Sequence, residues 1–248
     1  MITGASAGIG AATAVALAAH GFDLLLGARR LDALEALAED IRAHSPIKVA
    51  VSQLDVTDPA SVSDFASEVE VADVLVNNAG LALGRDRIES LDEGDVRTMW
   101  ETNVEGLIRV TRAFLPGMRG RATGHIVNVG SIAGFETYAG GGGYTASKHA
   151  VRAITRTLRI ELLGTPIRVT EVSPGLVETE FSIVRFAGDR DRASQVYEGI
   201  DPLTAEDVAD AIAWAVTRPP HVNIDEIVLK PVAQANSTAI ARDGAPLK

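Results

Sequence analysis

The sequence predicts a single α/β domain, residues 1–248, built on a doubly wound parallel sheet. Short apolar runs alternate with helical patterns along the chain, a glycine-rich turn separates the first run from the first helix, and no repeat, low-complexity tract or linker interrupts the 248 residues. Such alternation is typical of a parallel sheet with helices on both faces. We expect about seven strands, in the runs 1–2, 22–28, 47–52, 73–76, 124–129, 167–172 and 224–229.

The composition is that of an ordinary soluble globular protein, with 46% hydrophobic residues, 23% charged residues and a mean hydropathy of +0.14. The net charge of −10 and the isoelectric point of about 5.0 argue against binding to nucleic acid or to an anionic membrane. The absence of cysteine excludes disulfides, thiolate zinc sites and thiol nucleophiles, and it fits a cytoplasmic enzyme. The sequence shows no targeting peptide, no apolar run of the ~20 residues that span a bilayer, and no histidines at metal-ligand spacing.

The first motif is a glycine-rich turn, in which Gly4, Gly8 and Gly10 precede a helical pattern over 11–21. Glycines at a strand-to-helix turn let backbone amides approach a pyrophosphate at the helix N-terminus. A plain tight turn is the alternative. Since only Met1 and Ile2 precede Thr3, the first strand is either very short or trimmed at its start.

The second strand predicts the cofactor. It ends in Ala28, and Arg29 and Arg30 follow where an acidic residue would bind the 2′-hydroxyl of NAD. Two guanidinium groups instead suit the 2′-phosphate of NADP, which arginine binds in a planar fork. The alternative is a pair of solvated arginines at the start of a helix over 31–44.

Polar residues follow the third and fourth strands. Asp55 lies just past the third strand, where an adenine would bind, although Asp55 or Asp58 could instead cap the next helix. Asn77–Gly80 follows the fourth strand, and its small and amide residues allow close backbone approach to a nucleotide. An ordinary turn is the alternative.

A long helical pattern covers 91–118, and we expect Pro116-Gly117 to break it. Asn103 lies inside this pattern. Asparagine is mildly unfavourable in the middle of a helix, because its side chain competes for backbone groups. That cost hints at a functional role for Asn103.

The fifth strand leads to Ser131, and a run of four glycines then precedes Tyr144 at the start of a long helix. Tyr144 and Lys148 are four residues apart and therefore share one helix face. A phenol has a pKa of ~10, and an ammonium group on the same face favours the phenolate, as a tyrosine acid/base requires. Taken alone, this spacing also occurs by chance on many helices.

The last third of the chain supplies a lid and a tail. The sixth strand ends at Pro174-Gly175, and the polar and aromatic segment 176–200 is expected to cover the pocket as a substrate lid. A helix over 201–216, capped near Thr204, precedes the last strand. The tail 232–248 has no clear pattern and is expected to be an oligomer arm or a frayed end.

Together these motifs resemble the classical short-chain dehydrogenases/reductases, over nearly the whole chain. The matching segments are TGASAGIG (3–10), LDVTD around Asp55, NNAG (77–80), Asn103, GSIAG with Ser131, Tyr144-x-x-x-Lys148, and Pro174-Gly175 with Thr179. The segments NNAGLALG, YAGGGGY, SPGLVETEFSIVRFAGD and PPHVNIDEIVLKPVAQ resemble the NADP-dependent 3-hydroxy acid dehydrogenases within that family. The resemblance implies a Rossmann-type fold and a homo-oligomer, commonly a tetramer.

The resemblance also implies the site. Tyr144 would exchange a proton with the substrate oxygen, Ser131 would hydrogen-bond that oxygen, Lys148 would bind the nicotinamide ribose and lower the tyrosine pKa, and Asn103 would hold a proton-relay water. We expect Arg185, in the lid, to bind the substrate carboxylate, unless it pairs with Asp189 or faces solvent. The implied NADP-binding residues are Gly4, Ser6, Gly8, Ile9, Gly10, Arg29, Arg30, Asp55, Val56, Asn78, Ala79, Gly80, Tyr144, Lys148, Pro174, Gly175, Val177 and Thr179.

The leading hypothesis is therefore an NADP(H)-dependent oxidoreductase of small hydroxy acids such as serine, allo-threonine or 3-hydroxypropionate. A broader carbonyl reductase or a 3-oxoacyl reductase would share the same motifs, although the acidic chain shows no basic patch for an acyl carrier. A lyase on this fold would be expected to lack the glycine motif and Lys148. An NADP-sensing regulator would not need Ser131, Tyr144 and Lys148 together.

Overall fold

A seven-stranded parallel sheet forms the centre of the computed structural model, which describes residues 1–69, 72–121 and 123–242. The strands are β1 (Ile2–Thr3), β2 (Leu24–Ala28), β3 (Val49–Gln53), β4 (Val74–Asn77), β5 (Gly124–Val129), β6 (Ile167–Pro174) and β7 (Glu226–Leu229). Their order across the sheet is β3-β2-β1-β4-β5-β6-β7, and every neighbouring pair is parallel. The fold class predicted from the sequence is confirmed.

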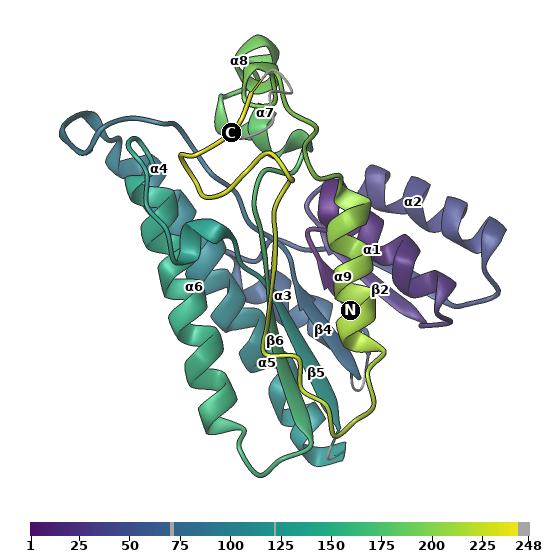
Figure 1. Ribbon diagram of the computed structural model, residues 1–248. Coiled ribbons are helices and arrows are strands. Elements are labelled where there is room, and N and C mark those ends of the chain that lie inside the picture. Colours follow the sequence, from purple (N-terminus) through teal and green to yellow (C-terminus); the bar gives the residue numbers. More distant parts are fainter. Residues whose placement is uncertain (70–71, 122, 243–248) are drawn as a thin grey trace.

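Helices cover both faces of this sheet (Figure 1). They are α1 (Gly8–Ala19), α2 (Leu31–His44), α3 (Pro59–Ser67), α4 (Glu93–Trp100), α5 (Gly106–Arg121), α6 (Gly142–Glu161), α7 (Glu180–Arg185), α8 (Arg190–Gln195) and α9 (Ala205–Val216). The buried faces of α1, α2 and α9 share one apolar cluster, and those of α3, α5 and α6 share the other. The short helices α7 and α8 lie beyond the carboxyl ends of the strands (Figure 1).

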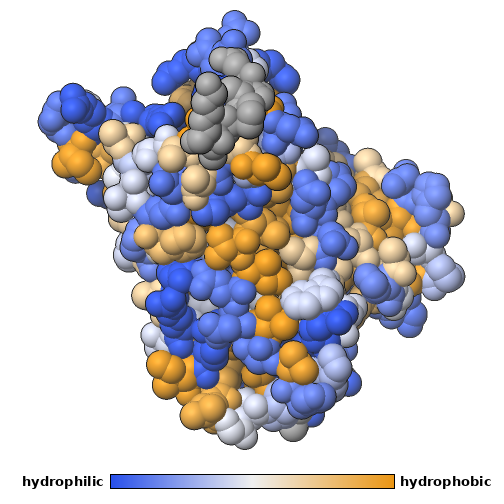
Figure 2. All heavy atoms as spheres, viewed as in Figure 1, coloured by the Kyte–Doolittle hydropathy of each residue, from blue (hydrophilic) through white to orange (hydrophobic). Residues whose placement is uncertain are grey.

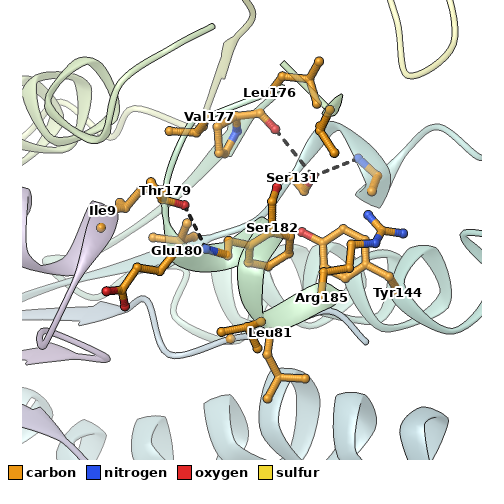
Figure 3. Close-up of a pocket in the computed structure, with 18 of the residues that line it drawn as sticks. Ile9, Leu81, Ser131, Tyr144, Leu176, Val177, Thr179, Glu180, Ser182 and Arg185 are labelled. Atoms are coloured by element: carbon orange, nitrogen blue, oxygen red, sulfur yellow. Dashed lines mark hydrogen bonds between the residues drawn. The ribbon is translucent and has the colours of Figure 1, made fainter. Parts of the chain in front are cut away.

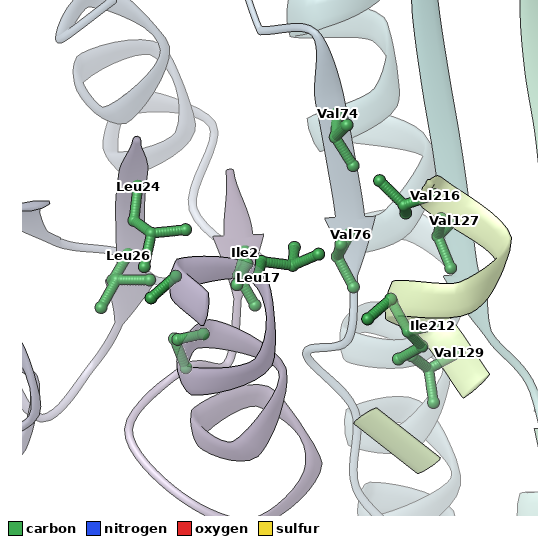
Figure 4. Close-up of a cluster of buried hydrophobic side chains, with 14 of the residues drawn as sticks. Ile2, Leu17, Leu24, Leu26, Val74, Val76, Val127, Val129, Ile212 and Val216 are labelled. Atoms are coloured by element: carbon green, nitrogen blue, oxygen red, sulfur yellow. The ribbon is translucent and has the colours of Figure 1, made fainter. Parts of the chain in front are cut away.

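Alternating side chains along each strand build these two cores. Leu24 and Leu26 of β2 belong to the cluster under α1, α2 and α9, which Figure 4 shows, whereas Leu25 belongs to the opposite cluster. In β4, Leu75 likewise belongs to the opposite cluster from its neighbours. Successive strand side chains point to opposite faces, so a continuous apolar run serves both cores.

The central strand β1 is only two residues long. Only Ile2 of β1 is in register with β4, opposite Val76. Side-chain hydrogen bonds extend this joint: the Thr3 hydroxyl oxygen accepts from the backbone N–H groups of Asn78 and Ala79, both at 3.0 Å. The Asn78 amide donates to the carbonyl oxygens of Thr3 (3.0 Å) and Gly4 (3.1 Å). The strand order reverses at this joint, where ligands bind in open α/β sheets.

The helical pattern over 91–118 forms two helices joined by a π-helical turn at Glu101–Glu105. The predicted break at Pro116 is wrong, because α5 continues through it to Arg121. A proline removes one N–H donor, and the side chains on either side of it, Phe114 (5% exposed) and Met118 (0%), are anchored in the core. Burial therefore holds the helix together across the proline.

Helix α9 begins as its sequence predicts. The Thr204 hydroxyl accepts from the Asp207 backbone N–H, and the Asp207 carboxylate accepts from the Thr204 backbone N–H, which is a complete capping box.

Figure 2 shows hydrophilic residues over most of the visible face, with an apolar strip near its middle, where the last part of the chain runs in Figure 1. Val228 and Val232 are among the exposed apolar side chains of that part.

Candidate active site

A cavity of about 1010 Å³ opens at the carboxyl ends of the strands, beside the β1–β4 joint. Its walls come from the glycine turn, the ends of the central strands, the start of α6 and the segment around α7 and α8. The predicted site residues in these walls are Gly4, Ser6, Gly8, Ile9, Arg29, Arg30, Asp55, Val56, Asn78, Ala79, Gly80, Ser131, Tyr144, Lys148, Pro174, Gly175, Val177, Thr179 and Arg185. Gly10 and Asn103 lie behind the walls rather than in them.

The glycine turn has the shape that an anionic ligand needs. Gly4 and Gly8 have φ angles of +64° and +54°, which residues other than glycine rarely adopt. A Cβ at Gly10 would lie 2.4 Å from the Gly4 carbonyl oxygen, so Gly10 allows α1 to pack closely on the turn. Helix α1 begins without a side-chain cap, which leaves the N–H groups of its first turn available to a pyrophosphate.

The two arginines after β2 have different surroundings. Arg30 donates from Nε and Nη2 to the Ser6 hydroxyl oxygen, both at 3.3 Å, and from Nη2 to the Glu180 carboxylate at 2.9 Å. The charge of Arg29 acts on Asp55. Burial raises the pKa of Asp55, but hydrogen bonds from Thr57 and the charge of Arg29 outweigh that effect and leave the pKa below its ordinary value. Arg30 is therefore the arginine that contacts the glycine turn.

Asp58, rather than Asp55, caps the helix after β3. The Asp58 carboxylate accepts from the Ala60 N–H at 2.9 Å. The Asp55 carboxylate accepts instead from the backbone and hydroxyl of Thr57, at 2.9 and 2.7 Å. Asp55 lines the cavity wall, and its hydrogen bonds with Thr57 stabilise the ionised carboxylate.

Ser131 and Tyr144 face each other in the cavity (Figure 3). The Ser131 hydroxyl donates to the Pro174 carbonyl at 3.4 Å and accepts from the Ala133 N–H at 3.1 Å. Burial raises the pKa of Tyr144 above its ordinary value, while a hydrogen bond with Ser131 and the charge of Arg185 oppose the rise. Ser131 and Arg185 thus act in the direction that the sequence analysis expects of Lys148, whose own effect on the tyrosine stays a prediction.

Lys148 is held behind the tyrosine. Its ammonium donates to the Val129 carbonyl at 2.9 Å and lies 6.0 Å from the centroid of the Tyr144 ring. Burial lowers the pKa of Lys148 to about 8, against the attraction of the Glu171 carboxylate. The side chain is 7% exposed and lines the cavity, so its charge is sensitive to whatever binds there.

Asn103 occupies the π-helical turn and is 2% exposed. Its side-chain oxygen accepts from the Leu81 N–H at 2.8 Å, and its amide donates to the Leu81 carbonyl (2.8 Å) and the Ser147 hydroxyl (3.0 Å). Isolated π-helical turns are frequent at functional sites. Through these hydrogen bonds Asn103 connects the π-helical turn to the segment after β4 and to α6. Its water-holding role stays a prediction.

Arg185 points at the tyrosine from the last turn of α7 (Figure 3). Its guanidinium carbon lies 5.7 Å from the Tyr144 ring centroid and 5.6 Å from that of Tyr138, and its Nε donates to the Gly84 carbonyl at 3.1 Å. The alternative of a pair with Asp189 is wrong, since that carboxylate caps α8 and no salt bridge to Arg185 occurs in the described residues.

Sequence reasoning missed several residues of this wall. Tyr138 and Phe181 border the substrate end, and the Phe181 ring lies 5.6 Å from that of Tyr144. The described part of the tail, 232–242, also reaches the cavity: the Gln234 side chain accepts from the Leu176 N–H at 2.9 Å, and Ser237 donates twice to Glu136 at 2.6 Å. Residues 243–248 of that tail lie outside the described residues.

Two other kinds of site find no support in the described residues. These contain no group of three or more His, Asp or Glu side chains that could hold a metal ion. Nor does any helix in that part of the chain have the length and apolar character to cross a membrane. The cavity at the strand ends is therefore the candidate site.

Comparison with known proteins matches the model of the short chain dehydrogenase family to residues 1–189. An uncharacterized oxidoreductase of Mycobacterium tuberculosis is 52% identical over 238 residues, covering 96% of this chain and 92% of its own. The NADP-dependent 3-hydroxy acid dehydrogenase of Schizosaccharomyces pombe is 43% identical over 247 residues, covering 98% and 95%. The closed form of a serine dehydrogenase complexed with NADP⁺ superposes with a TM-score of 0.91 at 40% identity, covering 97% and 98%.

Proposed function

The chain belongs to the short-chain dehydrogenase family, and from that premise we propose that it is an NADP(H)-dependent oxidoreductase of small 3-hydroxy acids. The observation that carries the substrate class is the position of Arg185, whose guanidinium carbon is 5.7 Å from the Tyr144 ring centroid. A cation beside the acid/base suits a substrate that carries a carboxylate close to its reacting carbon. The names of the relatives agree with this cofactor and with this substrate class.

The residues of the cavity fit a dinucleotide phosphate. The uncapped start of α1 and the positive φ angles of Gly4 and Gly8 suit the pyrophosphate, and Arg30 with Ser6 suits the 2′-phosphate. When bound, NADP(H) supplies the hydride acceptor or donor of the reaction. The protein supplies the proton transfer and the orientation of the substrate.

Tyr144 is the proposed acid/base. In the direction of ketone reduction it donates its phenolic proton to the substrate oxygen, and in oxidation the phenolate accepts that proton. Because burial raises the pKa of Tyr144, the protonated phenol is the resting form of the site, which favours the donating role. Ser131, which lines the same cavity as Tyr144, is placed to hold the same substrate oxygen.

Lys148 is proposed to stabilise the phenolate when it forms. With a pKa lowered to about 8, its ammonium is charged at neutral pH and loses its proton at moderately alkaline pH. An ammonium on the same helix face lowers the cost of the phenolate, whereas a neutral amine does not. The Lys148 charge therefore matters most in the oxidative direction.

The first experiment follows reduced-nicotinamide absorbance with NADP⁺ or NAD⁺ and a panel of L-serine, L-allo-threonine, 3-hydroxypropionate and neutral alcohols. Turnover of the hydroxy acids with NADP⁺ is expected, and Tyr144→Phe should lower kcat by at least ~100-fold while the protein still binds NADP⁺. Turnover of neutral alcohols alone would favour the broader carbonyl reductase.

A second experiment tests the carboxylate contact. Arg185→Gln removes the charge and should raise KM for hydroxy acids by about 10- to 100-fold, the value of a charge-assisted hydrogen bond, with no comparable change for neutral alcohols. Arg192→Gln is the matched control, because Arg192 also lines the cavity but its guanidinium stacks on Phe186 at 4.6 Å. Equal losses on acidic and neutral substrates would contradict the assignment.

A further inference from the structure

The guanidinium of Arg30, which contacts the glycine turn, already forms an ion pair with a carboxylate of the chain. Glu180 accepts from Arg30 Nη2 at 2.9 Å, across 150 residues of sequence. The same Nη2 atom, together with Nε, donates to the Ser6 hydroxyl oxygen at 3.3 Å. The described contacts of the guanidinium thus use Nε and Nη2, and one of these two atoms is shared between Ser6 and Glu180.

Glu180 belongs to the helix that also carries the proposed substrate arginine. It is the first residue of α7, after the cap Thr179, and Arg185 is the last. Figure 3 shows the two side chains pointing away from each other, Glu180 toward the side of Ile9 and Arg185 toward Tyr144. One six-residue helix therefore contacts both the cofactor end and the substrate end of the cavity.

The pair is open to competition from a ligand. The side chains of Arg30 and Glu180 are 52% and 56% exposed, so water and salt screen their attraction. A phosphate monoester carries nearly two negative charges at neutral pH and offers three acceptor oxygens, whereas the carboxylate carries one charge. Both groups bind best to the planar edge of a guanidinium.

We propose that Glu180 is a specificity-determining residue for the cofactor: its carboxylate occupies Arg30 until the 2′-phosphate of NADP(H) displaces it. This inference rests on the proposed use of NADP(H). Glu180 lowers the affinity for NADP(H), because the ligand must first break an ion pair and then bind near a displaced negative charge. NAD(H), which lacks the 2′-phosphate, leaves the Arg30–Glu180 pair in place.

The displacement also links the two ends of the cavity. Release of Glu180 breaks the ion pair between the first turn of α7 and Arg30, while Arg185 at the other end of the helix stays bonded to Gly84. Binding of the 2′-phosphate thereby changes a contact of α7, the helix that also carries Arg185. An ion pair between Arg30 and a residue outside the segment around α7 would not connect the two ends.

The test compares Glu180→Gln with the wild type in calorimetric titrations of NADP⁺, NAD⁺, adenosine 2′,5′-bisphosphate and AMP. Glutamine keeps the size of the side chain and removes its charge. We expect the Kd of the two 2′-phosphorylated ligands to fall about 3- to 10-fold at low salt, with little change for NAD⁺ and AMP, and the difference to shrink at high salt. Glu178→Gln, an exposed carboxylate two residues earlier in the chain, should leave all four Kd values unchanged.

Arg30→Gln completes a double-mutant cycle. In that background Glu180→Gln should lower the Kd of NADP⁺ by less than it does in the wild type, since no ion pair remains to be broken and only the nearby negative charge is removed. An unchanged or higher Kd for NADP⁺ in Glu180→Gln alone would overturn the inference, the higher value showing that Glu180 helps to hold the cofactor. A wild-type chain without any preference for NADP⁺ would overturn the proposed cofactor and this inference together. A wild-type preference whose size Glu180→Gln does not change would overturn only the inference.

Discussion

Lowering the pH from about 7.5 to about 5.5 should destabilise the folded protein by about 1.4 kcal/mol through one buried side chain, His125. His125 lies in β5 and is 1% exposed. Its Nε2 lies 2.8 Å from the Thr170 hydroxyl oxygen, and that hydroxyl donates to the Ile224 carbonyl at 2.6 Å. Thr170 therefore accepts, so Nε2 carries the proton and Nδ1 is the unprotonated nitrogen, buried without a partner among the described residues.

The sign and size of the effect follow from this geometry. Burial lowers the pKa of His125 to about 3, with a further contribution from the Arg168 charge, whereas an unfolded histidine has a pKa of ~6.5. Between these values only the unfolded chain binds the proton, so the free energy of unfolding falls as the pH falls through ~6.5. Between about pH 7.5 and 5.5 the proton uptake of the unfolded state grows tenfold, which corresponds to about 1.4 kcal/mol.

The assay is urea unfolding followed by circular dichroism at both pH values and one protein concentration. The matched variant is His125→Gln, which keeps an amide donor for Thr170 and does not titrate. The wild type should lose about 1.4 kcal/mol more than the variant between the two pH values, since every other titrating group is common to both. Equal losses would show that His125 is protonated in the folded state, and the argument from burial would be refuted.

Two further predictions concern packing and buried charge. Gly10→Ala would place a Cβ 2.4 Å from the Gly4 carbonyl oxygen and 2.5 Å from the Asn78 amide nitrogen, so thermal unfolding should show a loss of about 1–3 kcal/mol. Gly120→Ala, with open space around the new Cβ, should instead stabilise the protein by up to about 1 kcal/mol, and a similar loss at both positions would contradict the contact argument. Arg152→Met removes the cation that lies 3.5 Å from the Glu171 carboxylate, whose side chain is 3% exposed, and should cost about 3 kcal/mol in urea unfolding. Adding Glu171→Gln to that variant should recover part of the loss, and no recovery would mean that the charge of Glu171 is not the cause.

The sequence predicted the sheet because the information is local. The apolar runs after the first are long enough to be recognised alone, and the glycine turn marks where the chain passes from the two-residue β1 to α1. The break at Pro116 was predicted wrongly for the same reason, since local propensity contains no information about the burial of Phe114 and Met118. Tertiary packing overrode the preference of a single residue.

The site was predicted in its composition but not in its contacts. Family motifs suggested Ser131 and Tyr144, and charge and position suggested Arg185, and all three line one cavity. Nothing in the sequence, however, pairs Arg30 with Glu180 or joins Glu136 to Ser237. These contacts bridge 150 and 101 residues, and single-sequence patterns do not report such distances. The tetramer, the cytoplasmic location and the lid function of 176–200 stay predictions.

The cofactor end of the cavity contains two kinds of residue, which differ in how strongly a substitution affects the stability of the fold. The Asn78 amide donates to the carbonyl oxygens of Thr3 and Gly4 and so joins the two halves of the sheet, and a substitution at Gly4 or Asn78 therefore alters folding and binding together. Arg29, Arg30 and Glu180 are exposed and support no core. Cofactor preference can therefore drift or be redesigned at these three positions at little cost in stability, while the dinucleotide platform beneath them stays fixed.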